Sequence, residues 1–345
     1  MKNIKSMLPE ELEADILAMG EPKYRAKQVF KWLGRGVGSF EEMSDIPKSL
    51  RMKLEKEYTI YKPKVLSKQV SKIDGTIKYL WELYDGNAVE TVVMSYKHGN
   101  TVCVSSQVGC RQGCAFCAST IGGLVRGLEP SEILDEVLFS QLDSGKTISN
   151  IVLMGIGEPL DNFDNVVKFL KLVNHPDGMN IGMRHISLST CGIIEKFDEL
   201  ADLNLQLTLS VSLHAPDDET RSKIMPANIG RGVDNLMKSC KSYYEKTGRR
   251  ISFEYIMIDG VNDTEYHARL LAKRAKEVCA HVNLIPMNHV EESRFHPSTS
   301  GHIKGFIKIL EDEGVNVTVR RKLGGDVDAS CGQLRRKMQK GNDKK

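Results

Sequence analysis

The chain has 345 residues, 41% hydrophobic and 27% charged, which is ordinary for a globular protein and excludes collagen, a long coiled coil and wholesale disorder. Its 48 basic and 45 acidic side chains leave a formal net charge of +3, too balanced to indicate a nucleic-acid partner by itself. No run of 18 apolar residues occurs, and acidic residues stand where a signal peptide would be apolar. We therefore expect a cytoplasmic protein with no membrane partner.

The first part of the chain has the pattern of amphipathic helices. Leu8, Leu12 and Ile16 recur at helical spacing, and a second apolar run ends at the glycine-rich segment 34–38. Residues 1–60 are therefore predicted to form a helical accessory domain.

The next part, residues 61–98, changes character. It contains β-prone runs at 78–83 and 89–94, with turn signals at Asp74-Gly75 and Asp85-Gly86. The pattern predicts a small β extension that leads into the main domain.

From residue 99 the chain repeats a strand followed by a helix. The predicted strands are 102–104, 150–154, 185–190, 207–212, 251–258, 281–284 and 316–320. Repeated β-α units with crossover helices predict a parallel sheet over residues 99–322, either barrel-like or doubly wound. The active site of such a sheet lies at the C-terminal ends of the strands. Polar side chains at these ends are Glu158, Ser189, Ser212, His214 and Asn288.

Three cysteines within eight residues form the sharpest local motif. They are Cys110, Cys114 and Cys117, and Gly109 and Gly113 permit the tight loop that would bring them together. Three thiolates can hold three irons of a four-iron cubane and leave the fourth iron open to a chelating substrate. Zinc is the alternative, although a structural zinc site normally requires a fourth protein ligand. The spacing favours an iron–sulfur cluster, and a zinc site remains the alternative.

The C-terminal tail, residues 323–345, follows a basic stretch and carries one cysteine, Cys331. From Arg320 to Lys345 there are nine basic and three acidic residues. Such a segment is either a solvated, frayed terminus or a source of contacts to RNA phosphates.

The cysteine motif, with Phe116 before the third cysteine, resembles that of the radical S-adenosylmethionine (SAM) superfamily. Further motifs narrow the resemblance to the RlmN family, dual-specificity enzymes that methylate adenine C2 in 23S rRNA and tRNA. These motifs are Cys103-Val-Ser-Ser-Gln-Val-Gly-Cys110, Met154-Gly-Ile-Gly-Glu-Pro159, Ser187-Leu-Ser-Thr190, Ser212-Leu-His-Ala-Pro216, Asn283-Leu-Ile-Pro-Met-Asn288 and Gly325-Asp-Val-Asp-Ala-Ser-Cys-Gly-Gln-Leu334. The N-terminal Glu21-Pro-Lys-Tyr-Arg-Ala-Lys-Gln28 also resembles the family's accessory domain, so the resemblance covers nearly the whole chain.

The resemblance implies an α/β fold: a partial (β/α)6 radical SAM barrel with an N-terminal helical accessory domain, a candidate RNA-binding region, and a small β extension. It also implies two cofactors, a [4Fe-4S] cluster and SAM. The implied cluster ligands are Cys110, Cys114 and Cys117. The implied SAM-binding positions are Gly157, Glu158, Ser189, Ser212, Leu213, His214 and Asn288.

The resemblance further implies a covalent route. Cys331 matches the cysteine that becomes S-methylated, Cys103 matches the thiol that resolves the product through a transient disulfide, and Glu90 matches the proton acceptor. Two SAM molecules would be used for each product.

The implied partners are 23S rRNA, tRNA at the adenosine 3′ of the anticodon, and an electron donor such as flavodoxin or ferredoxin, with the enzyme a monomer. Two alternatives stay open: a Cfr-type adenine-C8 methyltransferase or other radical SAM enzyme, and a non-catalytic, zinc-stabilised nucleic-acid-binding module. Pro159 favours the RlmN type over the Cfr type, which usually carries alanine there. The distant pair Cys103 and Cys331 argues against the zinc module.

Overall fold

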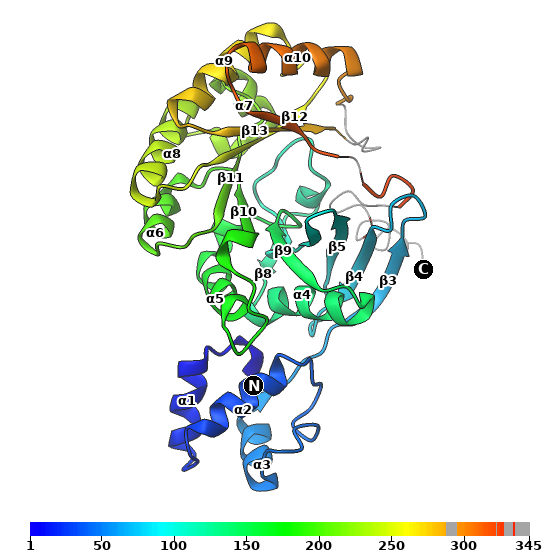
Figure 1. Cartoon of the computed structure of the whole chain (residues 1–345), viewed down its shortest axis with the longest axis vertical. Helices are drawn as coiled ribbons and strands as arrows, with labels where there is room; N and C mark the ends of the chain where they lie inside the picture. The colour runs from blue at the N-terminus through cyan, green and yellow to red at the C-terminus, as the bar shows by residue number, and fades with distance from the viewer. Residues whose placement is uncertain (288–294, 322, 328–333, 335–345) are drawn as a thin grey trace.

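The computed structural model describes residues 1–287, 295–321, 323–327 and 334. Three short helices come first and lie at one end of the molecule (Figure 1). They are α1 (Pro9–Ala18), α2 (Tyr24–Leu33) and α3 (Lys48–Glu57), and the short strands β1 (Lys2–Asn3) and β2 (Tyr58–Thr59) pair beside them. The apolar faces of these helices meet in a small core of their own. The helices predicted for this part of the chain are therefore present.

The rest of the described chain is built on one ten-stranded sheet, with the order β14-β13-β12-β11-β10-β9-β6-β5-β4-β3. The strands that pair in parallel are β6 (Gly99–Cys103), β9 (Ile148–Leu153), β10 (Ile186–Thr190), β11 (Thr208–Ser212), β12 (Ser252–Met257), β13 (His281–Pro286) and β14 (Val317–Val319). Each overlaps a strand predicted from the sequence. A separate hairpin, β7 (Gln107–Gly109) and β8 (Leu124–Gly127), brackets the cysteine loop.

Helices connect these parallel strands and cover the outer face of the sheet (Figure 1). The helices are α4 (Pro130–Ser144), α5 (Phe163–Asn174), α6 (Phe197–Asp202), α7 (Asp218–Ile224), α8 (Val233–Thr247), α9 (Glu265–Glu277) and α10 (Ser300–Asp312). The six units β6-α4, β9-α5, β10-α6, β11-α8, β12-α9 and β13-α10 confirm a partial (β/α)6 barrel. Its described edge strands, β14 and β3, do not pair with each other, so the barrel is open.

The β extension does not form a sheet of its own. Strands β3 (Lys64–Val70), β4 (Ile77–Glu82) and β5 (Ala88–Tyr96) continue the barrel sheet, because β5 pairs antiparallel with β6. Sequence reasoning found β4 and β5 but missed β3, whose residues are mostly exposed and therefore lack a buried apolar run. The extension thus lengthens the inner face of the barrel.

The N-terminal helices are held against the barrel by buried polar contacts as well as apolar ones. The Lys5 ammonium lies 2.5 Å from the Asp135 carboxylate on α4, with both side chains nearly fully buried. Leu172 of α5 belongs to the same apolar core as the helices. The accessory helices therefore pack against α4 and α5, on the outer side of the barrel.

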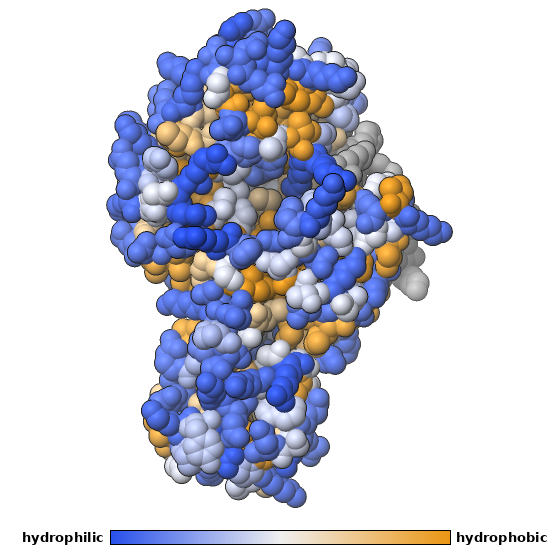
Figure 2. Space-filling model, in the orientation of Figure 1, coloured by the Kyte–Doolittle hydropathy of each residue, from blue (hydrophilic) through white to orange (hydrophobic). Residues whose placement is uncertain are grey.

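The surface is mainly hydrophilic on the face shown in Figure 2, with apolar patches scattered among polar ones. None of the helices in the described part of the chain is long and apolar enough to cross a membrane.

Candidate active site

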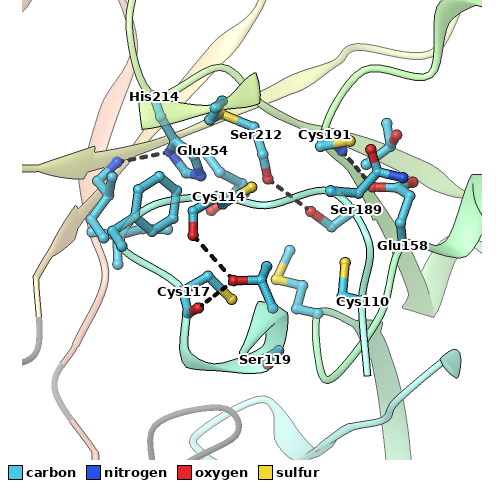
Figure 3. Close-up of a pocket in the computed structure, with 18 of the residues that line it drawn as sticks. Cys110, Cys114, Cys117, Ser119, Glu158, Ser189, Cys191, Ser212, His214 and Glu254 are labelled. Atoms are coloured by element: carbon cyan, nitrogen blue, oxygen red, sulfur yellow. Dashed lines mark hydrogen bonds between the residues drawn. The ribbon is translucent and has the colours of Figure 1, made fainter. Parts of the chain in front are cut away.

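A cavity of about 270 Å³ opens at the C-terminal ends of the parallel strands (Figure 3). Residues from the cysteine loop, from the turn after β9 and from the ends of β10 and β11 line it together. Of the site residues expected from the sequence, those in its wall are Cys110, Cys114, Cys117, Gly157, Glu158, Ser189, Ser212 and His214. Segments as much as 210 residues apart in the chain, from Cys110 to Arg320, therefore meet in one place, as expected for a parallel barrel.

The cysteine loop is shaped by backbone hydrogen bonds rather than by regular structure. The Cys110 amide donates to the Gly123 carbonyl at 3.0 Å, and the Cys117 amide donates to the Cys114 carbonyl at 3.0 Å. Gly109, with φ of +79°, precedes the loop, and a side chain there would lie 2.0 Å from the Gly123 carbonyl oxygen. Only glycine therefore lets the chain turn into the cysteine loop at this point.

Two of the three thiols, those of Cys110 and Cys114, lie where burial disfavours their ionisation. Burial raises the pKa of Cys110 to about 12, and the neighbouring Cys117 and Glu158 charges act in the same direction. Burial likewise raises the pKa of Cys114 far above its usual range. A bound metal centre stabilises thiolates directly and displaces their protons, so this donor set matches a cationic centre better than it matches exposed reactive thiols.

The spacing of the sulfur atoms bears on the choice between zinc and a cluster. Among the described residues, the one group of at least three His, Cys, Asp or Glu ligand atoms all within 4.8 Å of one another is Asp259, Asp263 and His302. At least one pair of the three cysteine sulfur atoms therefore lies more than 4.8 Å apart, whereas tetrahedral Zn–S bonds of about 2.3 Å bring the sulfur atoms closer together than this. A polynuclear cluster, in which each thiolate binds a different iron, fits this wider spacing.

Glu158 is fixed in the cavity wall at the end of β9. Its carboxylate accepts hydrogen bonds from the Cys191 amide at 2.7 Å and the Leu160 amide at 3.0 Å. Burial raises the pKa of this carboxyl, and the two amide donors oppose that rise. Because each carboxylate oxygen has two lone pairs, the group can still accept from an amine in the cavity.

Gly157 lies where no side chain fits. Its φ is +109°, and a Cβ there would lie 2.6 Å from the Gln107 Cβ and 2.7 Å from the Gln107 amide nitrogen. The glycine therefore lets the turn after β9 lie directly on the strand that leads into the cysteine loop.

We expect Gly157→Ala to destabilise the fold by about 3 kcal/mol, since left-handed strain and overpacking act together. Gly86→Ala is the matched control, because Gly86 has φ of +78° but nothing within 4 Å of its added Cβ. The free energy of unfolding of the control should fall by only about 1 kcal/mol, because of backbone strain alone. Urea denaturation of both variants measures the difference, and equal losses would show that the close approach at Gly157 is unimportant.

The ends of β10 and β11 supply hydroxyl and imidazole groups. The Ser189 and Ser212 hydroxyl oxygens lie 3.4 Å apart, and His214 is buried with φ of +56°. Burial, reinforced by the nearby Arg221 charge, lowers the pKa of His214 to about 3, so its ring is neutral. The Ile256 amide donates to its Nδ1 at 3.0 Å, which leaves the proton on Nε2.

Among the described residues, Leu213, Glu90 and Cys103 do not line this cavity. The Leu213 side chain is fully buried in the main core, so only its backbone lies between the two cavity residues Ser212 and His214. Glu90 is buried on β5, where its carboxylate lies 2.9 Å from the Lys78 ammonium. Asn288 and Cys331 lie outside the described residues.

Cys103 lies beside the cavity in a small apolar cluster with Val92 and Met94. Met154 packs against this cluster and also lines the cavity, so it links the two. Leu323, at the start of the C-terminal tail, packs against the same cluster. The described end of the chain therefore passes close to Cys103.

The tail is fastened just beyond this contact. The Gly324 amide donates to the Asp74 carboxylate at 2.8 Å, and the Asp326 carboxylate accepts from the Ser71 hydroxyl at 2.5 Å. These bonds attach residues 324–326 to the turn between β3 and β4, five residues before Cys331.

Sequence reasoning missed one residue that organises the site. Arg221 is 1% exposed, and its guanidinium donates to the backbone carbonyls of Leu213 at 2.9 Å, Cys191 at 2.7 Å and Ser212 at 3.1 Å. It therefore ties the ends of β10 and β11 together behind the cavity. Its position in a predicted helix gave no signal of this role, because the contacts depend on the tertiary fold.

Cys191 is not among the site residues expected from the sequence, and it is buried. Its thiol nevertheless forms part of the cavity wall, next to Glu158 (Figure 3). Burial raises the pKa of this thiol well above its usual value.

Comparison with known proteins agrees with this geometry. Residues 2–60 match the family model of the ribosomal RNA large subunit methyltransferase N-terminal domain, and residues 104–272 match that of the radical SAM superfamily. A solved radical SAM methyltransferase from Sphaerobacter thermophilus superposes with a TM-score of 0.91 at 38% identity, covering 96% of this chain and 99% of that one.

Curated relatives match over the full length of the chain. A probable dual-specificity RNA methyltransferase RlmN of Clostridium tetani is 49% identical, covering 100% of this chain and 99% of the relative. Another of the same description, from a Thermoanaerobacter species, is 51% identical, with 99% of each chain covered. With both family models matched in order and about half of all residues shared end to end, this chain belongs to the RlmN family of the radical SAM superfamily.

Proposed function

We propose that this protein is a radical SAM methyltransferase that methylates C2 of a specific adenosine in 23S rRNA, and of the adenosine 3′ of the anticodon in tRNA. The observation that carries the proposal is the identity of about half, along the whole chain, with relatives described as dual-specificity RNA methyltransferases. The three-cysteine cavity supports it, because adenine C2 is not a nucleophile and cannot take a methyl group from SAM by simple displacement.

In this proposal Cys110, Cys114 and Cys117 hold a [4Fe-4S] cluster. Gly157, Glu158, Ser189, Ser212, Leu213, His214 and Asn288 bind SAM, with Glu158 accepting from its amine and Leu213 acting through its backbone. When bound, the cluster and SAM supply one-electron transfer and a carbon radical that can take a hydrogen atom. The buried wall of the cavity excludes water from that radical.

The protein's own thiols carry the methyl group. Cys331 takes a methyl from a first SAM by nucleophilic displacement, and a second SAM is spent in removing one hydrogen atom from it. The remaining methylene carbon would bond to adenine C2 and Glu90 would accept the C2 proton, with the cluster, when bound, able to take up the surplus electron. The Cys103 thiolate then attacks the Cys331 sulfur, which forms a disulfide, breaks the carbon–sulfur bond and leaves the electron pair on carbon, where a proton completes the methyl group.

In the same proposal, each part of the chain has its own role. Residues 1–60 contribute to RNA binding, residues 61–98 extend the inner face, residues 99–322 form the catalytic barrel, and residues 323–345 carry the reactive cysteine. We infer that the enzyme works as a monomer in the cytoplasm, where its RNA substrates are found, and that it draws electrons from a small redox protein such as flavodoxin or ferredoxin.

The position of the methyl group tests the proposal. Reconstituted enzyme is incubated anaerobically with SAM, a reductant and protein-free 23S rRNA, and the digested RNA is compared with 2-methyladenosine and 8-methyladenosine standards by mass spectrometry. We expect 2-methyladenosine at one site, and the same product from tRNA. 8-Methyladenosine would identify a Cfr-type enzyme instead, and an iron-free zinc protein without product would contradict the proposal altogether.

A further inference from the structure

A buried ion pair lies on the same face of the sheet as Cys103. Side chains of successive strand residues alternate between faces, and Tyr79, Trp81 and Val89 belong to the main core beneath the helices. The residues next to them on the same strands therefore face the inner side of the barrel. Lys78 and Glu90 are among these inward-facing residues.

The register of the strands gives the arrangement on this inner face. Lys78 on β4 pairs with Val92 on β5, and Val92 pairs with Cys103 on β6. The three residues form one row across the sheet, and Glu90 lies one step along on the same face as Val92. With strands about 4.8 Å apart, Lys78 and Cys103 are separated by about 10 Å between Cα atoms.

The pair is deeply buried. The Lys78 ammonium lies 2.9 Å from a Glu90 carboxylate oxygen, and the two side chains are 0% and 3% exposed. Buried ion pairs are, on average, no more stabilising than apolar side chains of similar volume, because both ions lose their hydration. Stability alone therefore does not explain a fully buried lysine on β4, between the apolar core residues Ile77 and Tyr79.

We propose that Lys78 is a positioning residue for the removal of the adenine C2 proton, an inference that rests on the proposed function. An ammonium held 2.9 Å from a carboxylate by a charge-assisted hydrogen bond fixes the position of that carboxylate. Lys78 thus holds the Glu90 carboxylate, on β5, at the face on which Cys103 and the tail meet. In the step itself the C2–H bond breaks, its proton goes to the Glu90 carboxylate, and its electron pair stays in the ring.

The location of the tail supports this assignment. Leu323 packs on the cluster of Val92, Met94 and Cys103, so the chain that leads to Cys331 crosses the row that contains Lys78. An adenine joined through the methylene carbon to Cys331 would therefore be brought to this part of the inner face. Lys78 itself is not consumed in this step.

The test separates proton removal from earlier steps. K78M removes the ammonium, K78Q keeps a hydrogen-bond donor without charge, and K78R keeps the charge. For each reconstituted enzyme, three quantities are measured with protein-free 23S rRNA: methyl on Cys331, 5′-deoxyadenosine, and methylated adenosine. We expect K78M and K78Q to retain Cys331 methylation and 5′-deoxyadenosine formation but to lose about a hundredfold in methylated RNA, as for loss of a general base. K78R should recover to within about tenfold of the unchanged enzyme.

Lys64 is the matched control, since it pairs at 3.7 Å with Glu82 on the neighbouring strand but is 76% exposed. K64M should leave all three quantities unchanged. If K78M does not fold, the three quantities measured for K78Q test the role of Lys78 instead. If K78Q forms as much methylated RNA per 5′-deoxyadenosine as the wild-type enzyme does, the proposed role of Lys78 is wrong. An equal fall in all three quantities would also overturn that role, because it would indicate a structural role only. An unchanged enzyme without methylated Cys331 would instead contradict the proposed function, and this inference with it.

Discussion

Cys114→Ser should yield a protein that binds little iron and forms no methylated adenosine. Serine is a poor ligand for iron at neutral pH, and Cys114 lies in the cavity wall with Cys110 and Cys117. Because the radical route depends on the cluster, we expect a loss of at least about 10⁶-fold, the lower range of enzymatic rate enhancements. Iron and sulfide analysis, visible absorption and methylated-nucleoside yield measure the effect.

The control for this variant is a cysteine outside the cavity. Cys279 is exposed and follows α9, so Cys279→Ser should keep its iron, its colour and its activity. A Cys114→Ser protein with full iron content and normal product would contradict the ligand assignment. One zinc per chain in the unchanged protein, without iron, would favour the zinc-stabilised module.

Cys103→Ala should stop the reaction after the carbon–carbon bond has formed. Without a thiol to attack the Cys331 sulfur, the methylated base cannot be released, and RNA should stay covalently linked to the protein. We expect turnover to fall by at least about 10³-fold, as when a nucleophile that acts in an obligatory step is removed. The linked species should migrate slowly on a denaturing gel, and peptide mass spectrometry should find the nucleotide on Cys331.

Cys191 provides the matched control for this experiment, since the exposed fractions of Cys191 and Cys103 are 6% and 5%. Both thiols lie at or beside the cavity, but Cys191 has no assigned part in releasing the base. Cys191→Ala should therefore accumulate no linked RNA. Free 2-methyladenosine at normal yield from Cys103→Ala would show that another group resolves the product.

The elements of the barrel could be predicted because each one is locally encoded. Its parallel strands are short apolar runs separated by helical periodicity, so β9 to β13 were found within a few residues of their observed ends. The pairing of β5 with β6 could not be predicted in this way. It depends on non-local register, and the exposed β3 has no apolar pattern that would have indicated a third antiparallel strand.

The candidate site likewise contains residues that could be predicted from the sequence and residues that could not. Ser189 and Ser212 lie at the ends of β10 and β11, and Glu158 lies in the turn after β9. Because parallel strands bring their C-terminal ends together, the meeting of these residues in one cavity could be foreseen. Arg221 and Lys78 could not, since their roles arise from contacts with distant segments: Arg221 with the ends of β10 and β11, Lys78 with Glu90 on the next strand. Buried charged residues of this kind carry no periodic signal in the sequence.

The central claim is that a thiol near the C-terminus carries the methyl group to the RNA. The most direct measurement is peptide mass spectrometry of Cys331 in protein incubated with isotopically labelled SAM, followed by a chase with RNA and unlabelled SAM. The account predicts one labelled methyl on Cys331 before the chase and the labelled carbon in 2-methyladenosine after it. Labelled RNA product formed while Cys331 never carries label, or a labelled Cys331 that never passes its carbon to RNA, would contradict it.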